Sequence, residues 1–418
     1  MNLCAAWSEW IPVEERVSLA INDQLIGVPG YNQGKLSFTL SKSVLGCMAF
    51  LMLFPLDVVM QIVENSVGVS IPVGMLGIFL AAFLSIVVFF EAGLALTALL
   101  INFLFFVLFG ILVLTSKYGD FLGFYTFLRA FFVFCVGYYF GAFLVFEERT
   151  RFYRIFIALF FVLCLLVVFG SVKGLNYLRL ADGFSLLAFL ILARFKSQVY
   201  IFSIGLVSII VLYVMGARFS LLGFLLSASV LIWIRSSQVR RFFYPVVALI
   251  VGALVYYVGY FYFLSQEVIR ENRFVRLVYA SDDDGSFTER MSQFLLAKDA
   301  ILSNVYFGEY KYYEAEGLVG AYAHNLVSYW AEFGVFGFLY SLGLVFFSTF
   351  ILFLRTKIDR SWSFDFVVVV NVYFLSGLLL AKSYHWLVIY FIIGVNLFFI
   401  INLWSLVSRK IFVSYRGL

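Results

Sequence analysis

His324 is the residue best suited to proton chemistry in this sequence. The chain contains only two histidines, and an imidazole with its ordinary pKa of about 6.5 exchanges protons near neutral pH. His324 closes a long polar segment and directly precedes Asn325 and an apolar stretch. It is therefore a candidate general base, although an interfacial histidine that bonds a loop carbonyl would also fit this position.

Arginines suited to binding phosphate form the second group of candidates. A guanidinium group keeps its charge and forks onto two phosphate oxygens at once. Arg218 lies in a short turn between apolar stretches, and Arg179 and Arg290 lie in polar segments. Arg129 lies about two turns inside an apolar run, where a charge is costly and is often functional. A salt bridge or a lipid headgroup contact is the simpler interpretation of each arginine alone.

Weaker candidates lie close to these residues in the sequence. Arg276 follows Arg270 and Arg273 at a spacing of three residues, a pattern typical of a solvated helix beside the membrane, with contact to lipid phosphates as an alternative. Three neighbours of His324 could support its chemistry, namely Tyr322, Asn325 and Glu332. The aspartates at 282–284 are more simply a charged turn than a metal site, so no metal and no cofactor is expected.

The composition indicates which elements must carry these residues. Of the 418 residues, 64% are hydrophobic and only 13% are charged, which no soluble globular domain matches. Apolar runs of roughly 20 residues recur, and each is long enough to cross a hydrocarbon core of about 30 Å. The runs are continuous instead of alternating, which favours helices over a β-barrel. The net charge of +5 gives no indication of a nucleic-acid partner.

We predict an all-α polytopic membrane protein with about twelve transmembrane helices in a single integral domain over residues 1–418. The expected spans are about 40–62, 72–90, 93–114, 121–146, 152–170, 184–195, 198–215, 219–234, 242–264, 325–353, 364–381 and 386–407. The sixth span is short and is expected to be tilted, broken or buried within protein. A surface segment over 1–36 and one large polar loop over 265–324 complete the arrangement.

The distribution of cationic residues predicts the orientation. If 265–324 faces outward, the loops and the tail on the opposite side hold most of the arginines and lysines, as the positive-inside rule requires. Both termini are then cytoplasmic. Within the outward loop, Ser286 and Glu289 fit a capping box that begins an amphipathic helix over about 287–303. Its apolar residues are expected to pack on the aromatic surface at the membrane, and they are Phe287, Met291, Phe294, Leu295 and Leu302.

Four short motifs follow one another within about residues 150–353. They are Arg179 with Gly183; Gly216 with Arg218; Arg290 with Ile301 and Gly308; and His324 and Asn325 with Glu332, Gly334 and Gly337. In this order they resemble the O-antigen polymerase and O-antigen ligase superfamily of bacterial membrane glycosyltransferases. The chain departs from the family pattern at Ala217, where serine is usual, at Phe219, and at 305–307, where a proline often precedes the glycine.

The resemblance implies a multi-pass enzyme of the bacterial inner (cytoplasmic) membrane, with an architecture like that of C-type glycosyltransferases and a periplasmic active face. It also implies a donor glycan on undecaprenyl diphosphate and no metal or cofactor. The expected catalytic residues are His324, Arg218 and Arg290. The expected substrate-binding residues are Arg179, Arg129, Asn325, Tyr322, Glu332 and Arg276. The expected partners are the lipid-linked glycan, membrane lipid and a chain-length regulator protein.

The acceptor separates the functions within this superfamily. An O-antigen polymerase of lipopolysaccharide biosynthesis joins lipid-linked repeat units, whereas an O-antigen ligase transfers the glycan to lipid A-core. The loose and idiosyncratic motifs favour the polymerase. A lipid-linked sugar flippase or transporter is the alternative from a different class, although no paired interrupted helices are visible and the charges gather in outward loops. A structural partner of an envelope complex is a third interpretation.

Overall fold

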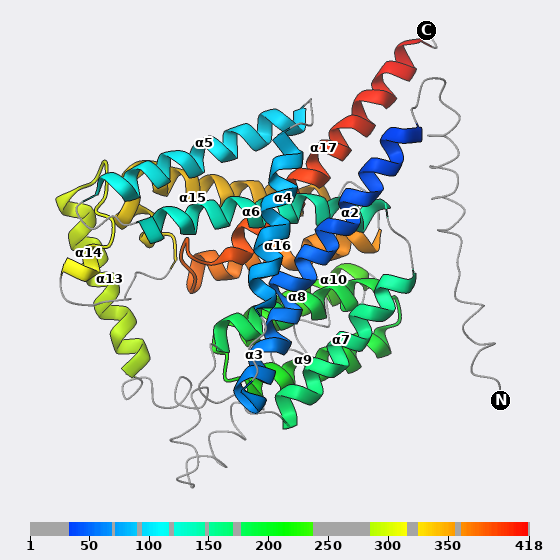
Figure 1. Cartoon of the computed structure of the whole chain (residues 1–418), viewed down its shortest axis with the longest axis horizontal. Helices are drawn as coiled ribbons and strands as arrows, with labels where there is room; N and C mark the ends of the chain where they lie inside the picture. The colour runs from blue at the N-terminus through cyan, green and yellow to red at the C-terminus, as the bar shows by residue number, and fades with distance from the viewer. Residues whose placement is uncertain are drawn as a thin grey trace.

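The computed structural model describes residues 33–68, 72–89, 94–116, 121–146, 150–169, 177–236, 285–315, 325–355 and 361–416. Within these residues every regular element is an α-helix (Figure 1). Among them, 7 helices are long and apolar enough to cross a membrane, and three shorter apolar helices accompany them. The described part of the chain is therefore all-helical and has the character of a polytopic membrane protein.

The helices in chain order are α2 (Gln33–Leu53), α3 (Pro55–Val67), α4 (Val73–Phe89), α5 (Leu94–Thr115), α6 (Phe121–Phe146), α7 (Thr150–Phe169), α8 (Tyr177–Arg194), α9 (Gln198–Val214), α10 (Arg218–Arg235), α13 (Gly285–Ser303), α14 (Tyr312–Ala315), α15 (Val327–Arg355), α16 (Trp362–Leu380) and α17 (Leu387–Arg416). Most predicted spans correspond to one helix each, because an apolar run must satisfy its backbone hydrogen bonds within itself. The predicted span 242–264, residues 1–32 of the surface segment and residues 265–284 and 316–324 of the loop lie outside the described residues.

Two boundaries differ from the prediction. The span expected over 40–62 is two helices, since α3 begins at Pro55, and proline favours the first position of a helix because it has no N–H to donate. The span expected over 184–195 is the 18-residue helix α8, which begins at Tyr177. The charge of Asp182 interrupts the apolar run, but its carboxylate is bonded within the protein, so the helix continues through it. As expected for this span, α8 is buried along most of its length.

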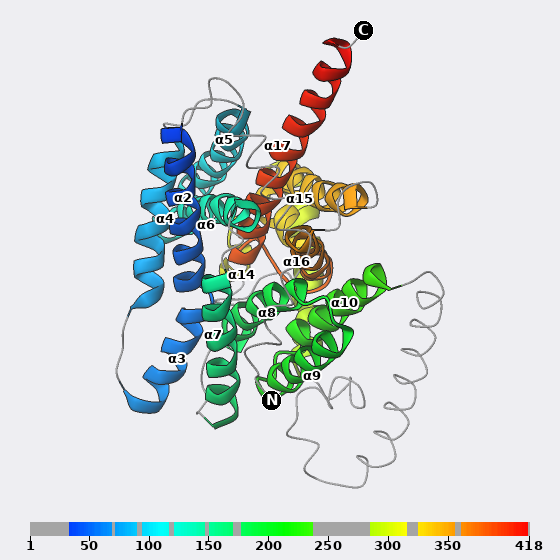
Figure 2. The ribbon, with the colours of Figure 1, turned by 90° about the vertical axis from the view of Figure 1, so that its right-hand side faces the viewer.

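Small residues bring α6 and α17 into close contact. A Cβ atom added to Gly137 would lie 2.0 Å from the carbonyl oxygen of Phe391, and one on Gly394 would lie 2.1 Å from that of Phe134. Such contacts replace the hydrophobic driving force that lipid does not provide. Beside this crossing, Figure 2 shows α8, α9 and α10 grouped next to α16.

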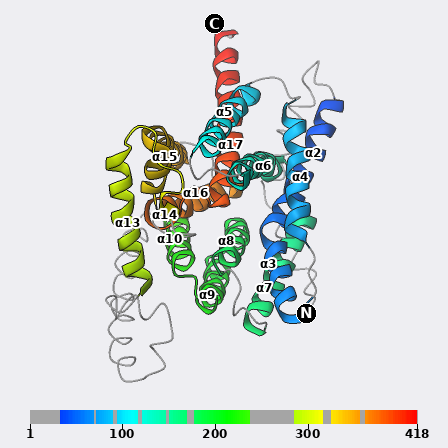
Figure 3. The same cartoon turned by 60° about the vertical axis from the view of Figure 1, so that its left-hand side comes forward.

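The two ends of the helix bundle carry different polar contacts. At the end where α8 and α10 stop and α16 begins, Arg235 pairs with Asp365 at 2.6 Å and donates to the carbonyls of Ala193 and Phe195. At the other end α8 and α10 begin and α16 stops. Figures 1 and 3 show α13 at the edge of the bundle, running across the direction of α15. The candidate site lies at the end where α8 and α10 begin.

Candidate functional site

A buried carboxylate, that of Asp182 in α8, gathers side chains from two other parts of the chain. Its Oδ2 accepts hydrogen bonds from Nζ of Lys382 at 2.9 Å and from the indole Nε1 of Trp386 at 2.7 Å. Its Oδ1 accepts from the hydroxyls of Tyr373 at 2.6 Å and Ser220 at 3.1 Å. Asp182 is 5% and Lys382 is 8% exposed, so the two charges neutralise each other away from water. We call these five residues the Asp182 hub.

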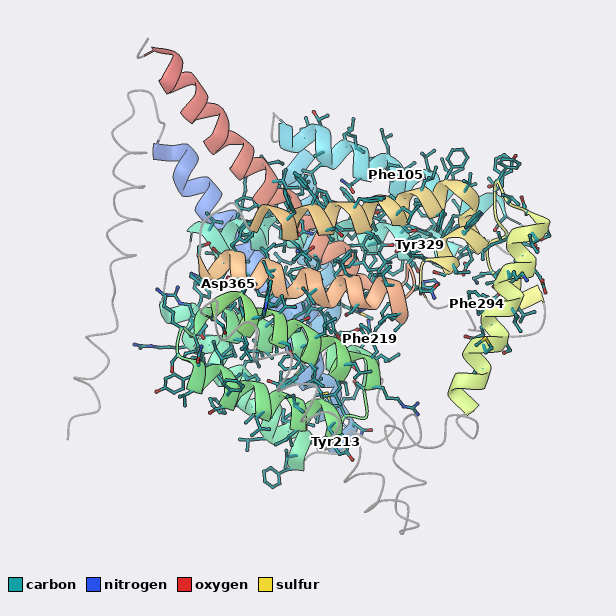
Figure 4. The ribbon with its side chains drawn as sticks, turned by 180° about the vertical axis from the view of Figure 1, so that it is seen from behind. Phe105, Tyr213, Phe219, Phe294, Tyr329 and Asp365 are labelled. Atoms are coloured by element: carbon teal, nitrogen blue, oxygen red, sulfur yellow. The ribbon has the colours of Figure 1, made fainter. Side chains whose placement is uncertain are left out.

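The Asp182 hub holds the turn that carries Arg218. Arg218 is the first residue of α10, and Ser220 of the hub follows two residues later. Gly216 forms the turn before the helix with a φ of 69°, a left-handed conformation that glycine adopts readily. Half-buried Arg218 is thereby fixed near the beginning of α8. Figure 4 labels Phe219, next to Arg218, and Asp365 near the opposite end of the bundle.

The loop 381–386 connects the hub to the beginning of α15. The backbone amide of Asn325 donates to the carbonyl of Lys382 at 3.2 Å. Asn325 has a φ of 77°, and its Oδ1 accepts from the amide of Val327 at 2.9 Å, which caps the start of α15. His324, which precedes Asn325 in the sequence, lies outside the described residues. The chain therefore enters α15 from a point that is tied to the hub.

α15 is interrupted near its beginning at Gly334, which has a φ of 66° and a ψ of −160°. The turn that follows α13 packs against the interruption. The amide of Glu309 donates to the carbonyl of Ala331 at 2.8 Å, and the amide of Val335 donates to the carbonyl of Val305 at 3.0 Å. Backbone groups freed by the break thus find partners in another segment, as a helix inside a membrane requires.

Glu332 lies beside this interruption and is only 4% exposed. The hydroxyl of Tyr384 donates to its Oε2 at 2.5 Å, and the backbone amide of Lys311 also donates to the carboxylate. Burial and the negative charge of Glu332 raise the pKa of Tyr384 well above its ordinary value, so the phenol remains a donor. The loop 381–386 therefore contacts both Asn325 and Glu332.

The second histidine of the chain, His385, lies on the same loop. Its ring packs on that of Tyr384 with 4.0 Å between the centroids, and the residue as a whole is exposed. The loss of hydration where the imidazole packs on the protein, together with the positive charge of Lys311, lowers the pKa of His385 to about 4. The imidazole is consequently neutral at neutral pH.

Arg129 and Arg179 interact electrostatically with each other, and both interact electrostatically with the carboxylate of Asp57 in α3. Arg129 is half-buried in α6, and Arg179 is exposed in the first turn of α8. Asp57 was not among the predicted residues because it sits in an otherwise apolar run with no motif around it. The arrangement is a second group of charges beside the Asp182 hub in sequence, since Arg179 precedes Asp182 by three residues.

The structure brings some of the predicted site residues together and describes others only in part. Asn325 and Glu332 are both bonded to the loop 381–386, and the turn of Arg218 is tied to the hub through Ser220. Arg129 and Arg179 influence each other electrostatically. The predicted residues His324, Tyr322 and Arg276 lie outside the described residues, as does the side chain of Arg290. Their predicted roles stay predictions.

The sequence analysis also missed residues around the hub and the loop 381–386, namely Asp182, Ser220, Lys382, Tyr373, Trp386 and Tyr384. The signal for Asp182 and Lys382 was present, since a charge next to an apolar run needs a partner or a function. No comparable signal marks the aromatic residues, because 21% of the chain is aromatic. Their polar atoms are identified only by the carboxylates that they contact.

α13 spans nearly the predicted residues, but the face that packs on the protein differs from the predicted one. Small and polar residues are buried, namely Gln293, Ala297 and Ala300, and the hydroxyl of Tyr313 donates to the carbonyl of Gln293 at 2.9 Å. The described residues of the predicted apolar stripe are exposed instead, and these are Met291, Phe294, Leu295 and Leu302. Figure 4 labels Phe294 on this helix. The stripe is therefore turned away from the described protein and is available to a membrane surface.

The chemistry of the site is that of charged and hydrogen-bonding side chains around an anion or a hydroxyl group. Within the described residues, no group of three or more His, Cys, Asp or Glu side chains could hold a metal ion. Guanidinium groups and a neutral imidazole are instead suited to phosphate binding and proton transfer. In comparisons with known proteins, neither a protein-family model nor a curated protein sequence matches this chain.

Proposed function

We propose that this chain is an O-antigen polymerase that joins undecaprenyl-diphosphate-linked oligosaccharide repeat units at the periplasmic face of the bacterial inner membrane. The observation that carries the proposal is the Asp182 hub. Asp182 lies between Arg179 and Gly183 of the first family-like motif, and Ser220 ties the hub to the Arg218 turn. Through Lys382 it reaches Asn325 of the last motif. Segments that carry three of the motifs thus lie at one end of the bundle, and this supports the proposal of a shared active site.

The proposed reaction is a glycosyl transfer without a metal. The bond between the donor sugar and its diphosphate breaks, and the acceptor hydroxyl oxygen forms the new glycosidic bond. Arg218 and Arg290 stabilise the negative charge that grows on the departing undecaprenyl diphosphate, which keeps the electron pair. His324 accepts the proton that the acceptor hydroxyl releases.

The remaining predicted residues bind the substrates or hold the site in shape. Asn325 and Glu332 hold the site in shape, because each is bonded to the loop 381–386 and both flank the first turn of α15. We assign Tyr322 and Arg276 to contacts with the glycan and its diphosphate. The apolar faces of the helices hold the polyprenyl chains.

Elongation by the purified protein in lipid nanodiscs, supplied with lipid-linked repeat units, tests the proposal. We expect His324→Ala to slow elongation by about 100-fold or more, and Arg218→Lys by a similar factor, because lysine keeps the charge but loses the fork. Arg194→Lys is the matched control, since Arg194 lies at the opposite end of α8, with its guanidinium 5.0 Å from the ring centroid of Trp362. Elongation by His324→Ala at the wild-type rate would rule out histidine catalysis.

The surface polysaccharide of a deletion strain separates the polymerase from the ligase. A single repeat unit on the lipid core indicates lost polymerisation, and this is the expected result. Bare core with intact lipid-linked polymer indicates lost ligation and would assign the chain as an O-antigen ligase.

A lipid-linked sugar flippase is the second candidate, and the interruption of α15 at Gly334 favours it, because broken helices are typical of transport sites. A flippase moves its substrate without changing any covalent bond. The test uses the protein reconstituted in liposomes. Lipid-linked repeat units that cross the liposome bilayer but are not joined to one another would select this function over the polymerase.

A further inference from the structure

Three tyrosine side chains lie together inside the bundle, next to the loop 381–386. Tyr329 and Tyr340 belong to α15, and their ring centroids are 6.4 Å apart. Tyr390 of α17 donates its hydroxyl hydrogen to the carbonyl of Tyr384 at 2.8 Å, and the ring of Tyr384 lies 5.9 Å from that of Tyr329. The hydroxyl of Tyr390 interacts electrostatically with those of Tyr329 and Tyr340. We call Tyr329, Tyr340 and Tyr390 the tyrosine cluster.

Phenylalanines of α5 cover the tyrosine cluster. The ring centroid of Tyr340 lies 5.0 Å from that of Phe105, and the ring centroid of Tyr390 lies 5.3 Å from that of Phe106. Figure 4 labels Phe105 on α5 and Tyr329 on α15. Tyr329 is 1% and Tyr390 is 2% exposed, and the hydroxyl oxygen of Tyr340 is buried as well. The three hydroxyls are therefore out of reach of bulk water and of lipid headgroups.

Two of these hydroxyls lack the hydrogen bonds that burial requires. In the part of the chain that the structure describes, the buried hydroxyls of Tyr329 and Tyr340 have no hydrogen-bond partner. The hydroxyls of Tyr329 and Tyr390 lie close to each other, but their geometry is not that of a hydrogen bond. Hydrocarbon offers no donor or acceptor, so an unpaired hydroxyl is costly there. Most buried polar groups are paired with protein or with ordered water, and these two hydroxyls therefore indicate a bound polar molecule.

A single water molecule matches the donors and acceptors of the tyrosine cluster. Its oxygen accepts the hydrogens of the Tyr329 and Tyr340 hydroxyls. One of its hydrogens is donated to the hydroxyl oxygen of Tyr390, whose own hydrogen is already bonded to the carbonyl of Tyr384. These bonds give the water about three partners, which is the usual number for a buried water molecule. A metal cation does not match the cluster, because it offers no acceptor for the two hydroxyl hydrogens.

We propose that the tyrosine cluster binds one buried water molecule, which bridges α15 and α17 and spans the interruption of α15. Tyr329 precedes Gly334, where the helix is broken, and Tyr340 follows it. The water thus ties the two parts of α15 to each other and, through Tyr390, to the carbonyl of Tyr384 in the loop 381–386. The water site does not depend on the proposed function, since a polymerase and a flippase would both contain it.

Thermal unfolding of the full-length protein in detergent micelles tests the site by the sign of the effect. Tyr329→Phe and Tyr340→Phe each keep the ring and remove only the hydroxyl. Each should lower the unfolding temperature by about 2 °C or more, because a hydrogen bond to the buried water is lost. A hydroxyl without a partner is instead a net cost, so a rise in the unfolding temperature of both variants would overturn the proposal. Tyr200→Phe is the matched control, since Tyr200 of α9 is 50% exposed, and it should change the unfolding temperature by less than about 1 °C.

The double variant Tyr329→Phe with Tyr340→Phe shows whether the two hydroxyls share one water molecule. Its effect should differ from the sum of the two single effects, because both hydroxyls act through the same water. A strictly additive effect would contradict a shared water molecule.

Cryo-electron microscopy in nanodiscs, at a resolution that shows ordered water, gives the direct test. The wild-type protein should show density within hydrogen-bond distance of all three hydroxyls, and the double variant should show none. Wild-type hydroxyls bonded directly to one another, with no density between them, would overturn the proposal.

Discussion

Lys382 and Asp182 both lose their hydration when the helices pack, and either charge alone would be very costly at that depth. The carboxylate receives four donors, and Nζ of Lys382 lies 5.3 Å and 5.1 Å from the ring centroids of Phe219 and Trp386. Such a buried pair adds little stability relative to a well-packed apolar pair. Its value is that α8, α10 and the loop 381–386 can satisfy these charges only in one arrangement.

Removing one partner of this pair should therefore destabilise the protein strongly. We expect Asp182→Asn to lower the free energy of unfolding by about 3–5 kcal/mol, because it leaves the ammonium group without a counter-charge. Lys382→Met should cost less, since the carboxylate keeps the donors of Tyr373, Trp386 and Ser220. Denaturant unfolding in mixed micelles measures both changes.

The double variant Asp182→Asn with Lys382→Met is the decisive control, because it removes both charges together. It should be more stable than Asp182→Asn alone. Lys298→Met, at an exposed position of α13, should change the stability by less than about 0.5 kcal/mol. A strictly additive double variant would show that the two charges do not interact.

Among the elements, the interrupted helix α15 sets the shape of the site. Gly334 has a backbone conformation that is open almost only to glycine, and a Cβ atom there would lie 2.1 Å from the carbonyl oxygen of Tyr306. A Cβ atom on Gly308 would lie 2.4 Å from the amide nitrogen of Gly334. The two glycines thus allow the turn after α13 to touch the backbone of α15, which keeps Glu332 next to Tyr384.

Gly334→Ala should break this contact and lower the stability by at least about 2 kcal/mol, because it adds both backbone strain and a clash. Gly343→Ala is the matched control on the same helix, since a Cβ atom there meets nothing within 4 Å. It should leave the stability unchanged or raise it by up to about 1 kcal/mol. Thermal unfolding in micelles compares the two variants, and equal effects would show that the interruption has no structural role.

At the scale of the whole molecule, the two ends of the bundle carry different polar side chains. The end with Arg235 and Asp365 closes the helices by direct ion pairing and by capping the last carbonyls of α8. The other end gathers the Asp182 hub, the Arg218 turn and the beginning of α15. The distribution of cationic residues in the sequence predicts that the second end faces the periplasm.

Thiol labelling in whole cells tests this orientation. In a variant without the native cysteines, Ser303→Cys at the end of α13 should react with a membrane-impermeant reagent from outside, because Ser303 is exposed. Lys196→Cys, exposed between α8 and α9, should react only after the cells are permeabilised. The native cysteines that the structure describes are buried. The reverse labelling pattern would place the proposed site in the cytoplasm.

The sequence alone determined the class of the protein and much of its helical layout. An apolar run of roughly 20 residues is a local property that forms a helix in lipid whatever surrounds it. The predicted all-α class is accordingly confirmed in the described residues, and most predicted spans there coincide with a helix. The predicted number of about twelve spans stays a prediction, since 7 of the described helices are long and apolar enough to cross a membrane. The positions of Arg218 at the start of α10 and of Asn325 before α15 also followed from local polarity.

Only the tertiary structure decided which polar groups meet. Asp182 and Lys382 are 200 positions apart, and no local pattern links them. No local pattern marks the break at Gly334 either, because the backbone groups there are bonded to the turn after α13. Nor does a local pattern show that α13 packs by its small residues instead of its apolar stripe. Helix formation depends on a residue's neighbours in sequence, whereas the partner of a buried charge depends on the packing of segments far apart in the chain.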